Sequence, residues 1–230
     1  MRRALKAALT PEWHHPTAKV VWALRALLAG LALYALTVEP TYTTRPLLVF
    51  SAVAGLAVSV AFAFVPTRRP RTLKAAEAAV LLAFAGHVVG HAFGVYQNWP
   101  PYDTVLHFSV PLVTPLILYA LSQSSPWLWD WRKVSPLEVG IYLFALAVTF
   151  GTLWEILEFL MDTFFGTREQ DNLADTMVDL IADVAGATLG ALVGAYATKL
   201  GREKGFDRVS EEPKRPAPAR SPREKGRAAE

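Results

Sequence analysis

The chain contains no cysteine, which excludes disulfide bonds, iron–sulfur clusters and thiolate metal sites. Charged residues are also scarce, at 19% of the 230 residues, and many of them lie in the last thirty positions. The sequence has no glycine-rich phosphate loop, no His-Glu-x-x-His motif and no serine-centred nucleophile elbow. With five histidines in all, it also lacks the many histidine boxes of membrane desaturases. These absences leave none of the common enzyme motifs.

Long apolar runs dominate what is present. Hydrophobic residues make up 53% of the chain, and the mean hydropathy is +0.27. A helix needs about 20 mostly apolar residues to cross the hydrocarbon core, and six windows qualify. These windows are Val20–Val38, Leu47–Val65, Ala75–Tyr96, Thr104–Leu121, Val139–Phe165 and Leu173–Leu200. The sequence therefore predicts an all-α fold, a polytopic transmembrane helix bundle with about six spanning helices.

The segments that flank these windows have a different composition. Residues 1–19 are expected to form a cytoplasmic N-terminal segment, without a cleavable signal peptide because its apolar stretch breaks at Thr10-Pro11. Residues 20–200 would form the six-helix transmembrane domain. Residues 201–230 are rich in Pro, Lys, Arg and Glu and predict a disordered charged cytoplasmic tail. The net charge of +3 does not indicate nucleic acid, since the basic residues lie between apolar segments and in the tail.

Basic residues occur in alternate connectors, and this pattern predicts the orientation. They lie before the first window, between the second and third, between the fourth and fifth, and in the tail. The other three connectors hold only Arg45, no basic residue, and Arg168. By the positive-inside rule, both termini are cytoplasmic and the protein is a multi-pass protein of the cytoplasmic membrane. Trp99 and Tyr102 would then mark the outer interface, and the tryptophans of residues 127–131 the inner one.

Polar residues fall at matching depths in four of the windows. With this orientation, His87 and His91 lie in the outer half of the third window, and Asp103 and His107 at the outer end of the fourth. The fifth window carries its polar residues late, and the sixth begins with acidic ones. These residues are Trp154, Glu155, Glu158 and Asp162, then Asp171, Asp175, Asp179 and Asp183. We predict one polar pocket that opens to the outside.

Helical spacing places these residues on shared faces. His87 and His91 are four residues apart, as are Asp103 and His107, so each pair shares a face. Two longer stripes are Gly151, Glu155, Glu158 and Asp162, and Asp175, Asp179, Asp183, Gly186, Gly190 and Gly194. The third window has its own glycines, at positions 86, 90 and 94. Because glycines let helices approach closely in lipid, we expect the third and sixth helices to pack together.

Carboxylates outnumber cations in the outer half of the bundle. A charge at mid-bilayer costs at least about 2.5–3.5 kcal/mol, so several carboxylates must be protonated, bind a cation or face water. Mixed His and carboxylate ligands suit Zn, Mn or Fe(II), so a divalent metal ion is a candidate cofactor. The candidate metal ligands are His87, His91, Asp103 and His107. Arg25, in the inner half of the first window, is expected to snorkel to the headgroups.

Several of these motifs resemble those of a known family. They are His87-x-x-Gly90, Tyr102-Asp103-x-x-x-His107-Phe108, Trp154-Glu155-x-x-Glu158, Asp171, Asp175-Thr176-x-x-Asp179 and Gly186-Ala187. In this order they resemble the YjdF-like inner-membrane proteins and, more distantly, VanZ-like membrane proteins. The resemblance covers roughly residues 83–194. It implies a small multispanning helical protein of the cytoplasmic membrane and brings no established reaction.

Three functions remain open from the sequence. The leading hypothesis is a site for a lipid-linked or amphiphilic substrate at the outer leaflet, with membrane lipid as partner; whether it is an enzyme stays undecided. Its acid–base groups or ligands would be Glu155, Glu158, Asp175 and Asp179, and its substrate contacts Tyr102, Trp154 and Arg168. The alternatives are a proton- or cation-coupled transporter and a non-catalytic membrane scaffold. Against transport, the inner halves of the helices carry no matching polar path.

Overall fold

The computed structural model describes residues 16–37, 43–65, 67, 69–124, 134–170 and 172–203. Its elements are α2 (Pro16–Thr37), α3 (Arg45–Phe62), α4 (Pro70–Ala92), α5 (Val95–Asn98), α6 (Tyr102–Ser124), α7 (Pro136–Phe165) and α8 (Leu173–Glu203). Every element in these ranges is a helix, and six are long and apolar enough to cross a membrane. This confirms the predicted all-α bundle. Residues 1–15, 204–230, Asp171 and the tryptophans of residues 127–131 lie outside the described residues.

Local sequence signals explain several helix ends. Proline occupies the first turn of α3, α4 and α7, where its missing N–H has no helical partner to lose. Ser135 and Glu138 form a capping box at the start of α7, and Gly166 ends that helix in the left-handed conformation. The predicted third window was wrong at its end, because α4 stops at Ala92 and Gly94 turns the chain with φ of 66° into the separate helix α5.

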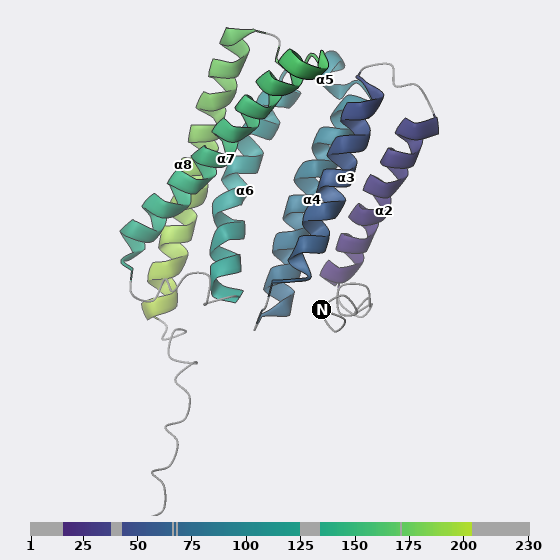
Figure 1. Cartoon of the computed structure of the whole chain (residues 1–230). Helices are drawn as coiled ribbons and strands as arrows, with labels where there is room; N and C mark the ends of the chain where they lie inside the picture. Colours follow the sequence, from purple (N-terminus) through teal and green to yellow (C-terminus); the bar gives the residue numbers. More distant parts are fainter. Residues whose placement is uncertain are drawn as a thin grey trace, which may run out of the picture.

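The helices form two groups of three that are joined side by side. Helices α2, α3 and α4 pack together, α6 packs against α7 and α8, and α4 packs on α6 between the groups (Figure 1). Helix α5 lies at one end of the bundle, whereas α2 begins and α8 ends at the opposite end. We call these ends the α5 end and the basal end. Both ends of the helical part of the chain are therefore on one side, as an even number of spans requires.

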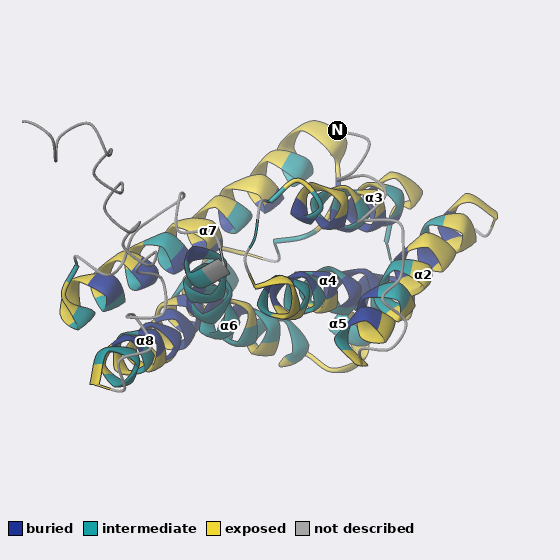
Figure 2. Ribbon diagram, turned by 90° about the horizontal axis from the view of Figure 1, so that it is seen from below, coloured by how far each residue is buried: buried dark blue, intermediate teal, exposed yellow. Residues whose placement is uncertain are grey.

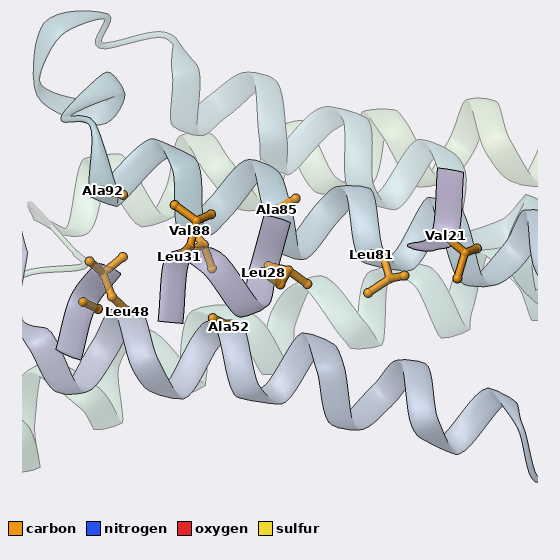
Figure 3. Close-up of a cluster of buried hydrophobic side chains, with 10 residues drawn as sticks. Val21, Leu28, Leu31, Leu48, Ala52, Leu81, Ala85, Val88 and Ala92 are labelled. Atoms are coloured by element: carbon orange, nitrogen blue, oxygen red, sulfur yellow. The ribbon is translucent and has the colours of Figure 1, made fainter. Parts of the chain in front are cut away.

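An apolar core holds the first three helices together. Leu28 of α2, Leu48 of α3 and Leu81 of α4 are at most 1% exposed and belong to one cluster of buried side chains (Figure 3). Outward-facing positions are apolar as well: Leu33 and Leu82 are each more than half exposed, and so is Leu192. In Figure 2 the buried residues line the inner faces of the helices and the exposed ones the outer faces. Apolar residues on both faces are what a helix in lipid requires.

The glycine stripe of α8 packs on α6. A Cβ atom on Gly186 would overlap the carbonyl group of Phe108, and one on Gly190 would overlap that of Leu112. Small residues thus bring two backbones together, as the sequence indicated. The predicted partner was wrong. Helix α8 packs mainly on α6 and α7, and α4 and α8 are not among the helix pairs that pack extensively. The third and sixth spanning helices therefore do not form the tight pair that we expected.

Arg25 does not snorkel as expected but closes a buried ion cluster near the basal end. Its guanidinium lies 2.5 Å from Glu77 Oε1 and donates to Ser59 Oγ at 2.7 Å. Lys74 Nζ lies 2.6 Å from the other Glu77 oxygen, and Glu77 is 1% exposed. The cluster links α2, α3 and α4. Glu77 is thus a buried carboxylate in the basal half of α4, whereas the expectation that the inner helix halves carry no polar path matching the outer residues stays a prediction.

Candidate functional site

The predicted polar residues meet at the α5 end of the bundle. They come from the end of α4, the start of α6, the end of α7 and the start of α8, which the up-and-down order brings to one level (Figure 1). His87, His91 and His107 are each at most 8% exposed. Glu155, Glu158 and Asp179 are buried to a similar degree. The predicted gathering of polar side chains from four spans is therefore present.

His107 lies at the centre of a group of carboxylates from three helices. Its Nδ1 atom is 3.2 Å from Asp183 Oδ1 and 3.5 Å from Glu155 Oε1. Its Nε2 atom is 3.6 Å from Oδ1 of Asp103, one turn earlier on α6. Asp179 is close enough for one of its oxygens to lie within 4.8 Å of ligand atoms of Asp103 and His107. We call Asp103, His107, Glu155, Asp179 and Asp183 the His107 cluster.

Three carboxylate oxygens of this cluster are buried without a hydrogen-bond partner. They are Glu155 Oε1, Asp179 Oδ1 and Asp183 Oδ2. The residues that carry them are 5%, 2% and 1% exposed, respectively. Asp183 fits because residue 151 is glycine: a Cβ there would overlap Asp183 Oδ2. A buried polar atom without a partner costs about 1–3 kcal/mol, and a charged one costs more. A proton or a cation bound at these oxygens would offset this cost.

A second group surrounds the two histidines of α4. His91 Nε2 lies 3.0 Å from Glu169 Oε2, and the rings of His87 and His91 are 4.6 Å apart. The Tyr96 hydroxyl of α5 lies 3.2 Å from His87 Nδ1. Burial, together with nearby carboxylates, raises the pKa of Tyr96, so its hydroxyl keeps its proton. We call His87, His91 and Glu169 the His91 cluster.

Asp162 fixes the loop that carries Glu169. Its Oδ1 atom accepts hydrogen bonds from Thr167 Oγ1 at 2.5 Å and from the Glu169 backbone N–H at 2.8 Å. Its Oδ2 atom accepts one from the Gln170 backbone N–H at 3.0 Å. The Gln170 side-chain amide then donates to Glu155 Oε2 at 3.2 Å. The loop between α7 and α8 is thus tied to both clusters.

The three residues predicted to contact a substrate lie on α7, on α6 and on the loop after α7. Trp154 donates from Nε1 to Glu158 Oε1 at 2.7 Å, and its ring lies edge-on to His87 at 5.0 Å. Tyr102 donates its hydroxyl to the Gly86 carbonyl at 2.8 Å, which links α6 to α4. Arg168 is exposed on the loop after α7. Substrate contact by these residues stays a prediction.

Two cavities flank the His91 cluster. One, of about 250 Å³, has a polar lining of His91, Glu169 and residues from the loops at the α5 end, namely Thr43, Thr44, Gln97, Gly166, Thr167 and Arg168. The other, of about 150 Å³, is an apolar groove between α3, α4 and α7. Its polar lining residues include His87, Glu158 and Glu169. Glu169 lines both cavities, so they are adjacent.

The candidate metal ligands divide into two sets rather than one. His87 and His91 group with Glu169, whereas Asp103 and His107 group with Asp179. His107 also groups with Glu155 and Glu158. In each set one ligand atom per residue lies within 4.8 Å of the others. Asp175 belongs to none of these sets and is partly buried one turn before Asp179.

Some residues of the site were missed from the sequence. Glu169, Gln170 and Tyr96 lie in a loop and a short helix, where no helical spacing marks them. Asp183 is different, because it continues the stripe of Asp175 and Asp179 and had a signal. It was not named as a site residue, although it is the carboxylate closest to His107.

The comparisons with known proteins identify a family. The family described as "Predicted membrane protein (DUF2238)" matches residues 20–199, which covers all six long helices except the first residues of α2 and the last residues of α8. The chain belongs to this family. DUF2238 membership agrees with the resemblance to the YjdF-like proteins, and nothing supports the resemblance to VanZ-like proteins. No curated protein and no solved structure matches the chain. The DUF2238 description names a membrane protein and no activity.

Proposed function

We propose that the protein binds a divalent metal ion in the His107 cluster and uses it on the polar head of a membrane amphiphile. The observation that carries the proposal is the set of three buried carboxylate oxygens without a partner around one imidazole. An acidic cluster alone has many explanations. Buried oxygens without a hydrogen-bond partner are rarer, and a cation bound beside His107 would offset their charge.

The charge balance supports a cation. Among the described residues, the ion pairs that Asp103, Glu155 and Asp183 form are all with His107. A single imidazole carries at most one positive charge, whereas the cluster holds four carboxyl groups. A bound divalent ion would offset two of these charges. One imidazole with carboxylates is a donor set for Zn, Mn or Fe(II) rather than for a thiolate-selecting metal.

The neighbouring groups suggest roles for the predicted residues. His107, Asp103 and Asp179 would hold the ion, and Glu155, which groups with His107 and Glu158, would lie beside it. When bound, the ion would polarise a phosphoryl or carbonyl oxygen of the substrate head. Glu158 is buried at the groove, where Trp154 orients it, and is suited to hold or accept a proton. Asp175 is partly buried closer to the loop and would be a second proton acceptor.

We further propose that the α5 end faces the outside of the cytoplasmic membrane. The described basic residues support this orientation: Lys19, Arg71, Lys74, Lys199 and Arg202 lie in the basal turns of their helices. Near the α5 end only Arg45 and Arg168 are basic among the described residues. By the positive-inside rule the basal end would be cytoplasmic. The site would then lie at the depth of the outer headgroups.

Equilibrium dialysis of the detergent-purified protein, stripped with chelator, tests metal binding. With Zn²⁺ or Mn²⁺ the wild type is expected to bind about one ion per chain in the micromolar range or tighter. His107→Gln and Asp179→Asn should each weaken binding by about tenfold or more. Glu138→Gln, which removes a carboxylate at the basal end of α7, is the control. No saturable binding by folded wild type, or equal loss in the control, would overturn the proposal.

Cation-coupled transport is a second candidate because of Glu77. This carboxylate is buried near the basal end of the same helix that carries His87 and His91 at the other end. Intramembrane carboxylates and histidines mark proton and ion paths. Glu77 already contacts Arg25 and Lys74, however, which offset its charge. Ion flux in proteoliposomes that Glu77→Gln abolishes would favour transport; its absence would remove this candidate.

A further inference from the structure

The apolar groove is positioned to receive a hydrocarbon chain from the bilayer. Its walls are Leu47, Phe50, Ser51 and Ala54 of α3, Phe84 of α4, and Leu157 and Met161 of α7. Phe50 is 54% exposed and Leu157 is 37% exposed, so the groove opens on the outer face of the helices. In a membrane this face meets acyl chains. The wall of α3 and α4 is firmly packed, since a Cβ on Gly55 would lie 2.9 Å from Phe84.

The groove runs between the two three-helix groups. Its residues on α3 and α4 belong to one group and those on α7 to the other. Helices α3 and α7 are not among the pairs that pack closely. Sites between packed units are common places for small ligands. The groove lies in the half of the bundle toward the α5 end, since α3 begins there and α4 and α7 end there (Figure 1).

The polar cavity offers donors for an anionic head. Arg168 supplies a guanidinium, and Thr43, Thr44 and Gln97 carry hydroxyl or amide groups. Its carboxylate, Glu169, is already paired with His91. Arg168 is exposed and directly precedes Glu169, the residue that lines both cavities. A guanidinium with surrounding hydroxyls suits a phosphate group, since arginine matches phosphate oxygens in a bidentate way.

We infer that the two cavities together form the binding site of a phosphorylated amphiphile. The hydrocarbon chain next to the head would lie in the groove between α3 and α7, and the phosphate would lie in the polar cavity against Arg168. The inference rests on the proposed function, because it names the substrate class on which the metal site would act. Glu158 lines the groove and belongs to one of the His107 ligand sets, so a molecule bound in the groove would lie beside a residue of the proposed metal site.

Binding of dodecyl phosphate to the purified protein in a neutral detergent tests this inference. Ala54→Trp and Leu157→Trp fill the groove, and each should weaken binding by about tenfold, which corresponds to about 1.4 kcal/mol. Ala57→Trp is the matched control, because Ala57 is exposed on α3 and is not a groove residue. Arg168→Gln should weaken binding to a similar degree, whereas Arg45→Gln at the start of α3 should not.

Two further ligands distinguish the contribution of the hydrocarbon chain from that of the phosphate head. Dodecanol should bind much more weakly than dodecyl phosphate if Arg168 holds the head, and inorganic phosphate should also bind weakly if the groove contributes. Equal binding of inorganic phosphate and dodecyl phosphate would mean an anion site without a lipid role and would overturn the inference. Equal losses of dodecyl phosphate binding in Ala54→Trp and Ala57→Trp would also overturn the inference, because they would indicate general lipid contact at the protein surface.

The result can be separated from the fate of the metal proposal. Dodecyl phosphate binding is measured on chelator-treated protein, and it should persist there, because no residue of the His107 cluster lines either cavity. Persistent, groove-dependent binding without any metal binding would leave the amphiphile site standing and the metal site refuted. Metal binding with no groove-dependent amphiphile binding would refute the amphiphile site and leave the metal site standing. Size-exclusion profiles show which variants remain folded.

Discussion

His107 and Asp183 are 76 residues apart in sequence, yet Nδ1 of the histidine lies 3.2 Å from Oδ1 of the aspartate. The contact depends on close approach of α6 and α8, which Gly186 permits one turn beyond Asp183. It also depends on Gly151 of α7, which leaves room for the other Asp183 oxygen. Three helices are thus packed so that one imidazole faces a buried carboxylate. The polar site and the glycine packing are one structural feature.

Gly186→Val should destabilise the protein more than a comparable change elsewhere. A side chain at this position would overlap the Phe108 carbonyl, and overpacking of this kind costs about 1–3 kcal/mol. The apparent midpoint of thermal unfolding in detergent should fall. Gly30→Val is the control, because nothing lies within 4 Å of a Cβ built there. Equal midpoints for the two variants would contradict the assigned packing of α8 on α6.

The Arg25–Glu77 pair should show strong coupling. Removal of Glu77 leaves the Arg25 charge in a largely buried position, and removal of Arg25 leaves Glu77 with Lys74 alone. Breaking a buried pair costs about 3–5 kcal/mol. Arg25→Met and Glu77→Leu should therefore each destabilise the protein strongly, whereas the double variant should recover much of the loss. The measurement is a double-mutant cycle of unfolding free energies. The pair Lys199–Glu203, 4.0 Å apart and exposed, is the control and should show little coupling.

Asp162→Asn should loosen the loop between α7 and α8. Asp162 accepts hydrogen bonds from Thr167, Glu169 and Gln170. Because the amide of asparagine is a weaker acceptor than the carboxylate, the substitution should release Glu169 from His91. Because the chain has no cysteine, a nitroxide at Arg168→Cys reports on this loop alone. Its spectrum should show faster motion in the Asp162→Asn background. Glu138→Gln, which alters a similar carboxylate that accepts from the Ser135 backbone N–H at the other end of α7, should leave the spectrum unchanged.

The orientation can be tested with the same cysteine-free chain. In intact cells, a membrane-impermeant maleimide should label Arg168→Cys but not Lys199→Cys, because the two positions are expected on opposite sides. Lys199→Cys should be labelled only after the cells are permeabilised. The reverse pattern would place the site on the cytoplasmic side and refute an outer-leaflet substrate.

Much of the fold could be predicted from the sequence, because hydropathy and length alone define the spans. The partner of each helix could not be predicted. Glycines at helical spacing indicate that a helix packs closely, but they do not indicate which helix it packs against. Gly186 therefore predicted close packing but the wrong partner. Arg25 shows the same limit: its depth was clear, but its pairing with Glu77 depends on how α2 and α4 are rotated.

The site was predictable to the extent that regular helices carry it. Helical spacing and an even number of spans were enough to bring His107 and Glu155 to one level. Glu169 had no such signal, because its position depends on the hydrogen bonds that Asp162 makes with the loop backbone. The division of the histidines into two clusters also depends on side-chain directions that spacing does not give.

X-ray absorption spectroscopy of the zinc-loaded protein is the most direct test of the His107 cluster as a metal site. The account predicts a first shell of oxygen donors with one imidazole, at about 2.0–2.2 Å. His107→Gln should remove the imidazole signal, whereas His91→Gln should leave it unchanged. A shell made only of water oxygens, or an imidazole signal that is lost with His91 and kept without His107, would contradict the account.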